Sequence, residues 1–267
     1  MKTQNFRNLK KFLGELTVSS AVIYSSVQEA RNIVSTQYKD MSDPWSQFAR
    51  KHDIILDGVV EDKFLNRINH LLFLNINTAF DDYFKCFKSD CFKYKHQGWR
   101  CDDKEPLVSQ IKKNLKISDN YNSDNLKAFL DVLDYYKSVR NKIAHSSDDC
   151  DGEALSDKLN KEGVEILRSY YNMRTAPNEY CNIGYHDIKF FSRILLDFLP
   201  KIEGLIYPGD EIILQYLSEE ITLKYKKMLL TRQKRANSYL ASCLQNEFGI
   251  ESSRCKEIVE RYSGSLA

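Results

Sequence analysis

The feature that most constrains this chain is a long run of apolar residues at helical spacing, from about Val59 to Phe87. They recur at intervals of three and four and are Phe64, Ile68, Leu72, Ile76, Ala79, Tyr83 and Phe87, with Phe73, Phe80 and Phe84 beside them. Because an α-helix turns once every 3.6 residues, side chains at this spacing share one face. The pattern predicts a long amphipathic helix that is central to the core.

The scarcity of Gly and Pro extends this prediction to the whole chain. Only 10 Gly and 5 Pro occur among 267 residues, which favours long helices over turn-rich sheets. Further helical patterns cover residues 9–34, 123–143, 156–171, 186–206 and 210–244, with a short one after Ser252. Nothing requires a strand. We therefore predict an all-α helical bundle, with the polar stretch 89–121 as a long loop holding one short helix at most.

Breaks in these patterns divide the chain into three predicted parts. Asp43-Pro44 interrupts the first helical pattern, and Asp57-Gly58 offers a turn before the next. We expect an N-terminal helical arm over residues 1–55 that serves packing or dimerisation. A helical domain over 56–207 and a C-terminal extension of basic helices over 208–267 would follow.

Composition excludes some classes of protein and leaves others open. A net charge of +2 does not identify a nucleic-acid-binding protein, so only local clusters of charge can do so. No apolar run reaches about 18 residues and no export signal begins the sequence, which predicts a cytoplasmic protein without membrane contact. The 7 Cys are then expected to be reduced thiols.

The candidate chemistry lies near the end of the helix predicted over 123–143, in the segment Arg140-Asn141-Lys142-Ile143-Ala144-His145. On a helical wheel, Arg140 falls inside the apolar arc of this helix. A buried guanidinium without a partner costs several kcal/mol. Arg140 is therefore expected to meet a carboxylate, a subunit interface or a phosphate-binding cleft.

This hexapeptide resembles the signature of the HEPN proteins, in which an Arg followed by a polar residue precedes a His by a few positions. The aromatic-acidic Phe80-Asp81-Asp82-Tyr83 is similar to a looser feature of the preceding HEPN helix. Some HEPN toxins carry a modified Tyr two residues after the His, where this chain has Ser147. That mode of control is therefore not expected here.

The resemblance implies a metal-independent endoribonuclease without a cofactor, acting in defence or in a toxin–antitoxin pair with an antitoxin or regulatory partner. Two subunits of a homodimer would share one cleft and cleave RNA through a 2′,3′-cyclic phosphate. His145 would be general base or acid, Arg140 would stabilise the charged phosphorane, and Asn141, one helical turn before His145, would orient its ring.

Three alternatives stay open at this point. The chain could be a non-catalytic HEPN-like module that binds RNA or a protein. Arg140 could pair with an acid of the bundle while His145 only caps a helix end. Residues 248–259, where Gly249 lies between two short helical patterns, could form a helix-turn-helix that binds DNA.

Two basic clusters are candidate RNA contacts. In the stretch 89–121, cations and aromatic residues alternate, and Lys93, Lys95, Trp99 and Arg100 are the proposed ligands of phosphate and base. Near the C-terminus the proposed phosphate ligands are Lys226, Lys227, Lys234 and Arg235. A solvated surface would explain the first cluster equally simply, and it is the commoner explanation for a run such as the second.

Other combinations of reactive residues are weaker indications of a functional site. Cys86, Cys91, His96 and Cys101 are five residues apart, a spacing that structural zinc sites rarely use, so we predict no metal. His186-Asp187 is read as a pair at a helix start, because adjacent helical residues point in different directions.

Overall fold

The computed structural model describes residues 2–56, 58, 61–96, 98–102, 105–117, 126–145, 159, 161–173 and 175–266. Within these residues all regular structure is helical, which confirms the all-α prediction. The α-helices are α1 (Gln4–Gln37), α2 (Pro44–Arg50), α3 (Glu61–Lys95), α4 (Leu107–Leu115), α5 (Leu126–His145), α7 (Lys161–Tyr171), α8 (Tyr185–Leu205), α9 (Asp210–Ile213), α10 (Glu219–Leu229), α11 (Gln233–Phe248) and α12 (Ser252–Leu266). Short 3₁₀ turns occupy Tyr180–Asn182 and Leu214–Tyr216.

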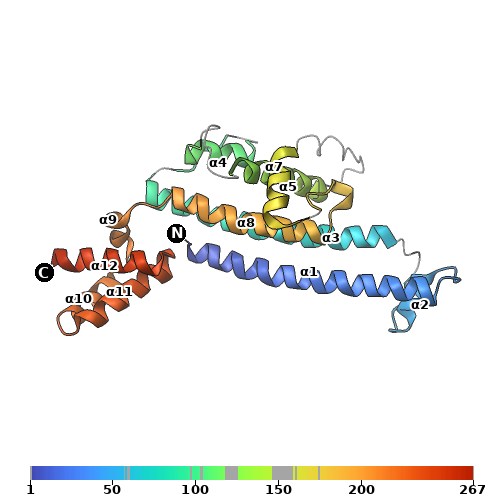
Figure 1. The fold of residues 1–267 in the computed structure, drawn as a ribbon, viewed down its shortest axis with the longest axis horizontal. Helices are drawn as coiled ribbons and strands as arrows, with labels where there is room; N and C mark the ends of the chain where they lie inside the picture. Colours follow the sequence, from blue (N-terminus) through green and yellow to red (C-terminus); the bar gives the residue numbers. More distant parts are fainter. Residues whose placement is uncertain are drawn as a thin grey trace.

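Three long helices, α1, α3 and α8, lie lengthwise against one another and form the body of the molecule (Figure 1). Helix α5 packs on α3 and α8, with α4 and α7 in contact with it. Helices α10, α11 and α12 pack together at the end of the body where the N-terminus lies (Figure 1). In the described part of the chain, none of the helices has the length and hydropathy needed to cross a membrane.

An aromatic cluster joins α3, α5 and α8 at the centre of the core. The ring of Tyr136 lies 5.3 Å from that of Phe73 and 4.7 Å from that of Phe191, measured between centroids. Its hydroxyl donates to the buried carboxylate of Asp187 at 3.0 Å. Because a buried tyrosine needs a partner for its hydroxyl, this bond fixes how α5 is rotated about its axis.

Two sequence-based boundaries were wrong. Helix α3 continues to Lys95, so residues 89–95 are helical and not part of a long loop, although α4 is the short helix expected there. The single helix predicted over 210–244 is divided into α9, α10 and α11. Ser218 begins α10, because its hydroxyl accepts a hydrogen bond from the amide of Ile221. The start of α7 predicted at Ser156 lies outside the described residues.

The N-terminal residues are attached to the C-terminal helices. The amide of Lys2 donates to the carbonyl of Gly249 at 3.1 Å, in the turn between α11 and α12. One residue on, the amide and hydroxyl of Thr3 donate to the buried carboxylate of Glu203 on α8, at 2.9 and 2.5 Å. Helix α1 thus packs on α3 and α8, and hydrogen bonds from Lys2 and Thr3 hold its start in place.

Gly249 is expected to tolerate no side chain. It adopts the left-handed conformation, with φ at +59°, and an added Cβ would lie 1.6 Å from the carbonyl oxygen of Lys2. Gly58 provides the matched control, since its φ is +64° but an added Cβ would meet nothing within 4 Å. In urea denaturation, Gly58→Ala should cost about 1 kcal/mol and Gly249→Ala about 3 kcal/mol or more. Equal losses would contradict this close approach.

Candidate functional site

Arg140 lies in the last part of α5 and reaches across to α3. Its side chain is 34% exposed, so it lies at the edge of the buried face rather than within it. Its Nη2 lies 3.5 Å from the Oδ2 of Asp81, and its Nη1 donates to the Oδ1 of Asn141 at 3.0 Å. The first of the three expected partners, a carboxylate, is therefore present within the chain.

The carboxylate of Asp81 is shared between two cations. Its Oδ1 accepts from the Nζ of Lys137 at 2.6 Å, while its Oδ2 faces Arg140. Lys137 is only 15% exposed, and burial lowers the pKa of its ammonium despite the nearby carboxylate. Two positive charges and one negative charge leave this group of side chains with a net charge of +1. The group can attract a phosphate but does not need one to be stable.

His145 is the final residue of α5, and its side chain is exposed. Five residues of helix separate it from Arg140 by about 7.5 Å along the axis and about 140° around it. No hydrogen bond joins it to Asn141 in the described part of the chain, and the Oδ1 of Asn141 instead accepts from Arg140. The expected orientation of His145 by Asn141 is thus not found. Ser147 lies outside the described residues.

The sequence analysis missed Lys137 as a member of the site. Lys137 and Arg140 are three residues apart and therefore share a helix face. Two cations on one largely apolar face indicated that one carboxylate could pair with both of them. Asp81 belongs to the aromatic-acidic segment noted in the sequence, but its partner could be identified only from the packing of α3 against α5.

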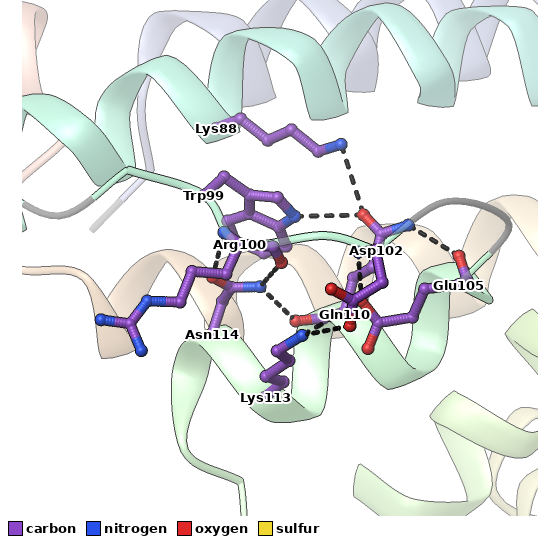
Figure 2. Close-up of polar contacts among 8 residues, drawn as sticks. All are labelled: Lys88, Trp99, Arg100, Asp102, Glu105, Gln110, Lys113 and Asn114. Carbon is purple, nitrogen blue, oxygen red and sulfur yellow. Dashed lines mark hydrogen bonds and ion pairs between the residues drawn. The ribbon is translucent and has the colours of Figure 1, made fainter.

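The residues of the first basic cluster do not all lie together, because Lys93 has different neighbours from Lys95, Trp99 and Arg100. The Nζ of Lys93 lies 5.3 Å from the ring centroid of Tyr216 and 5.9 Å from that of Phe248, so this lysine packs on the C-terminal helices. The Nε1 of Trp99 donates to the Oε1 of Gln110 at 3.1 Å, as Figure 2 shows. Arg100 points away from that bond, with its guanidinium free of α4 (Figure 2).

Trp99 is half-buried, and its ring meets those of Phe84 and Phe87 edge to face. It therefore joins this segment to α3. Lys95 and Arg100 are exposed and lie at one pocket with it. The RNA contacts proposed for these residues stay a prediction.

The second basic cluster lies on the turn between α10 and α11. Lys226 and Lys227 are in the last turn of α10, and Lys234 and Arg235 are in the first turn of α11. All four side chains are exposed. The two helices are consecutive and pack together, so the four cations gather at one end of the helix pair.

Three candidates remain, which are the His186-Asp187 pair, the cysteine set and the turn at Gly249. Asp187 accepts hydrogen bonds from the amides of Asn178 and Gly184 at the start of α8, as expected for a helix-start pair. Among the described residues, no three His, Cys, Asp or Glu side chains lie together as metal ligands would. Cys91 is buried whereas Cys86 and Cys101 are exposed. Gly249 ends α11, and α12 packs against α11; the helix-turn-helix reading of residues 248–259 stays a prediction.

Comparisons of the chain with protein-family models, with curated proteins and with solved structures found no match. The HEPN resemblance therefore depends on the residues described above.

Replacing Asp81 should lower the stability of the fold and raise the affinity for anions. Asp81→Asn leaves Lys137 and Arg140 without a counter-charge, raising the net charge of the group from +1 to +2. Because Lys137 is largely buried, we expect a loss of about 1–2 kcal/mol in the free energy of unfolding. Affinity for RNA should rise, as measured by fluorescence anisotropy at low salt.

The matched control is Asp82→Asn, since Asp82 is the neighbouring carboxylate, is 66% exposed and, among the described residues, pairs with Lys85 alone. It changes the net charge of the chain equally. If both variants behaved alike, the pairing of Asp81 across the two helices would have no special role.

Proposed function

We propose that the chain is a HEPN-type endoribonuclease that cleaves RNA without a metal ion, with Arg140 and His145 as the catalytic residues. The observation that supports this most is the placement of the motif. Its His is exposed at the end of α5, and its Arg is half-exposed beside an excess positive charge. Such a site can receive a phosphodiester from solvent.

The proposed reaction is transfer of the phosphoryl group to the adjacent 2′-oxygen. One His145 accepts the proton of the 2′-hydroxyl, whose oxygen then bonds to phosphorus. The bond from phosphorus to the 5′-oxygen breaks, and that oxygen takes a proton from the His145 imidazolium that the first transfer creates. The products are a 2′,3′-cyclic phosphate and a 5′-hydroxyl. Arg140 stabilises the negative charge that grows on the phosphoryl oxygens.

A homodimer would complete the site. Within one chain Arg140 and His145 leave α5 in different directions, so a phosphate held by Arg140 needs a proton donor from elsewhere. A second copy that approaches α5 across a two-fold axis would bring its own His145 to that phosphate. Lys226, Lys227, Lys234 and Arg235 could then hold more distant parts of the RNA backbone.

A second function is favoured by the pairing of Arg140 with Asp81. An arginine that already has a carboxylate partner resembles one half of a structural ion pair, and within the described residues no hydrogen bond joins Arg140 to His145. The alternative is a non-catalytic module that binds RNA or a protein through the same face. A role in defence and an antitoxin partner belong to the proposal and derive only from the resemblance, and the cytoplasmic location proposed with them derives from the sequence pattern alone.

Substitution of the motif tests catalysis directly. His145→Ala should lower the rate of RNA cleavage by about 10²–10⁴-fold, the usual loss for a general acid–base group, and Arg140→Ala by about 10²-fold or more. The assay is cleavage of end-labelled RNA in chelator, followed by identification of the cyclic phosphate. Lys127→Ala, an exposed change at the other end of α5, should leave the rate unchanged.

The outcomes separate the two functions. Cleavage that survives either motif substitution, or that requires magnesium, would remove the proposed mechanism. Binding of RNA without any cleavage would favour the non-catalytic module. Melting curves of each variant show whether a lost activity reflects lost folding.

Mixing the two inactive variants tests the shared cleft. A dimer formed from one Arg140→Ala chain and one His145→Ala chain retains one Arg140 and one His145, so partial activity should return after the chains exchange. Light scattering at micromolar concentration should show the dimer. A monomer with full activity would exclude this arrangement.

A further inference from the structure

A pocket of about 360 Å³ lies where α3, α4 and α8 end. Cys91 and Lys95 of α3 form one side, residues 113–116 of α4 another, and Leu205 and Ile206 of α8 a third. The segment 98–100, which carries Trp99 and Arg100, closes it. Its volume is at the lower end of the range for small-molecule sites.

The polar lining of this pocket is mainly basic. Lys95, Arg100, Lys113 and Lys116 contribute cations, and none of the described residues that line it is acidic. Lys113 pairs with two carboxylates, those of Asp102 and Glu105, at 2.8 and 3.5 Å, so these three side chains together carry a charge of −1. The other three have no ion pair in the described part of the chain.

The partial negative charges at helix C-termini offset only part of the positive charge of this pocket. Three helix C-termini meet here, and each carries about half a negative charge, together about −1.5 against the three unpaired cations. With the further charge of −1 on the Lys113 group, about half a positive charge remains uncompensated. This excess is what an anion-binding site requires.

The geometry around Arg100 and Lys116 also indicates a preformed site. The amide of Arg100 donates to the Oδ1 of Asn114, and its carbonyl accepts from the Nδ2 of Asn114, both at 2.7 Å (Figure 2). The main chain of Arg100 is therefore held in place while its guanidinium stays free. Lys116 has a φ of +54°, a conformation that favours glycine, although its side chain carries a charge.

We propose that this pocket binds the phosphate of a nucleotide, with Lys95, Arg100 and Lys116 around the phosphate. The apolar floor of Leu115, Leu205 and Ile206 would lie beneath the nucleoside. The phosphate belongs to a free nucleotide or to one residue of an RNA strand. Lys95 is 14 residues beyond Asp81 on α3, about 21 Å along the helix, so the pocket is separate from the Arg140 group.

Binding can be followed through Trp99, because the chain has only 2 Trp and the other, Trp45, is on α2. In a Trp45→Phe background, adenosine monophosphate should change the fluorescence of Trp99, and adenosine should do so far more weakly. A 2′-O-methyl oligoribonucleotide, which lacks the attacking hydroxyl, tests the strand. The assay needs no cleavage, so its result is independent of the catalytic proposal.

Four variants test the role of each charge. Arg100→Gln should weaken binding about tenfold. Lys116→Gly should also weaken binding yet keep or raise the melting temperature, because glycine suits the left-handed conformation. Asp102→Asn should tighten binding by freeing Lys113. Lys63→Gln, at the far end of α3, is the matched control and should change nothing.

Response to adenosine monophosphate supports a free nucleotide as ligand, and response to the oligoribonucleotide alone supports a strand. Equal binding of adenosine and its monophosphate would overturn the proposal. So would a complete lack of response, or unchanged affinity in both Arg100→Gln and Lys116→Gly.

Discussion

Tyr136 is the side chain on which the orientation of α5 depends. Its ring is buried between α3 and α8, and its hydroxyl is bonded to a carboxylate that is itself buried. Rotation of α5 would expose the ring and leave Asp187 without one of its donors. Because Arg140 follows Tyr136 by four residues, it must leave the helix on the same side, where α3 provides Asp81. Packing at the core thus determines what the candidate site can contact.

Much of the fold could be predicted from the apolar spacing, and the errors have a specific cause. Phe87, Cys91 and Tyr94 are buried at intervals of four and three, so the pattern of α3 continues beyond Phe87. The lysines around them belong to the exposed face of the same helix and made the segment look like a loop. Between 210 and 244 the apolar pattern persists through two breaks that the spacing does not record, and only the break before α10 has a side-chain cap, at Ser218.

The sequence predicted that Arg140 needs a counter-charge, but it did not predict which residue supplies it. A cation on a mostly apolar face requires a counter-charge, and that much follows from the sequence. Asp81 and Asp82 are equally plausible partners along the chain, and only the rotation of α3 selects the first. The pocket at the end of α3 was beyond prediction for a similar reason. Lys95, Arg100 and Lys116 come from three segments, and their proximity depends on where α3 and α4 stop.

The bond between Lys2 and Gly249 has a consequence for how the chain is made. The two residues are 247 positions apart, which at about 5–20 residues per second means that Lys2 leaves the ribosome tens of seconds before its acceptor is synthesised. During that interval the amide of Lys2 lacks its acceptor at Gly249. The apolar face around Leu9 and Leu13 is then not yet fully packed. Nascent chains should therefore be recognised by chaperones at this end until translation passes the turn between α11 and α12.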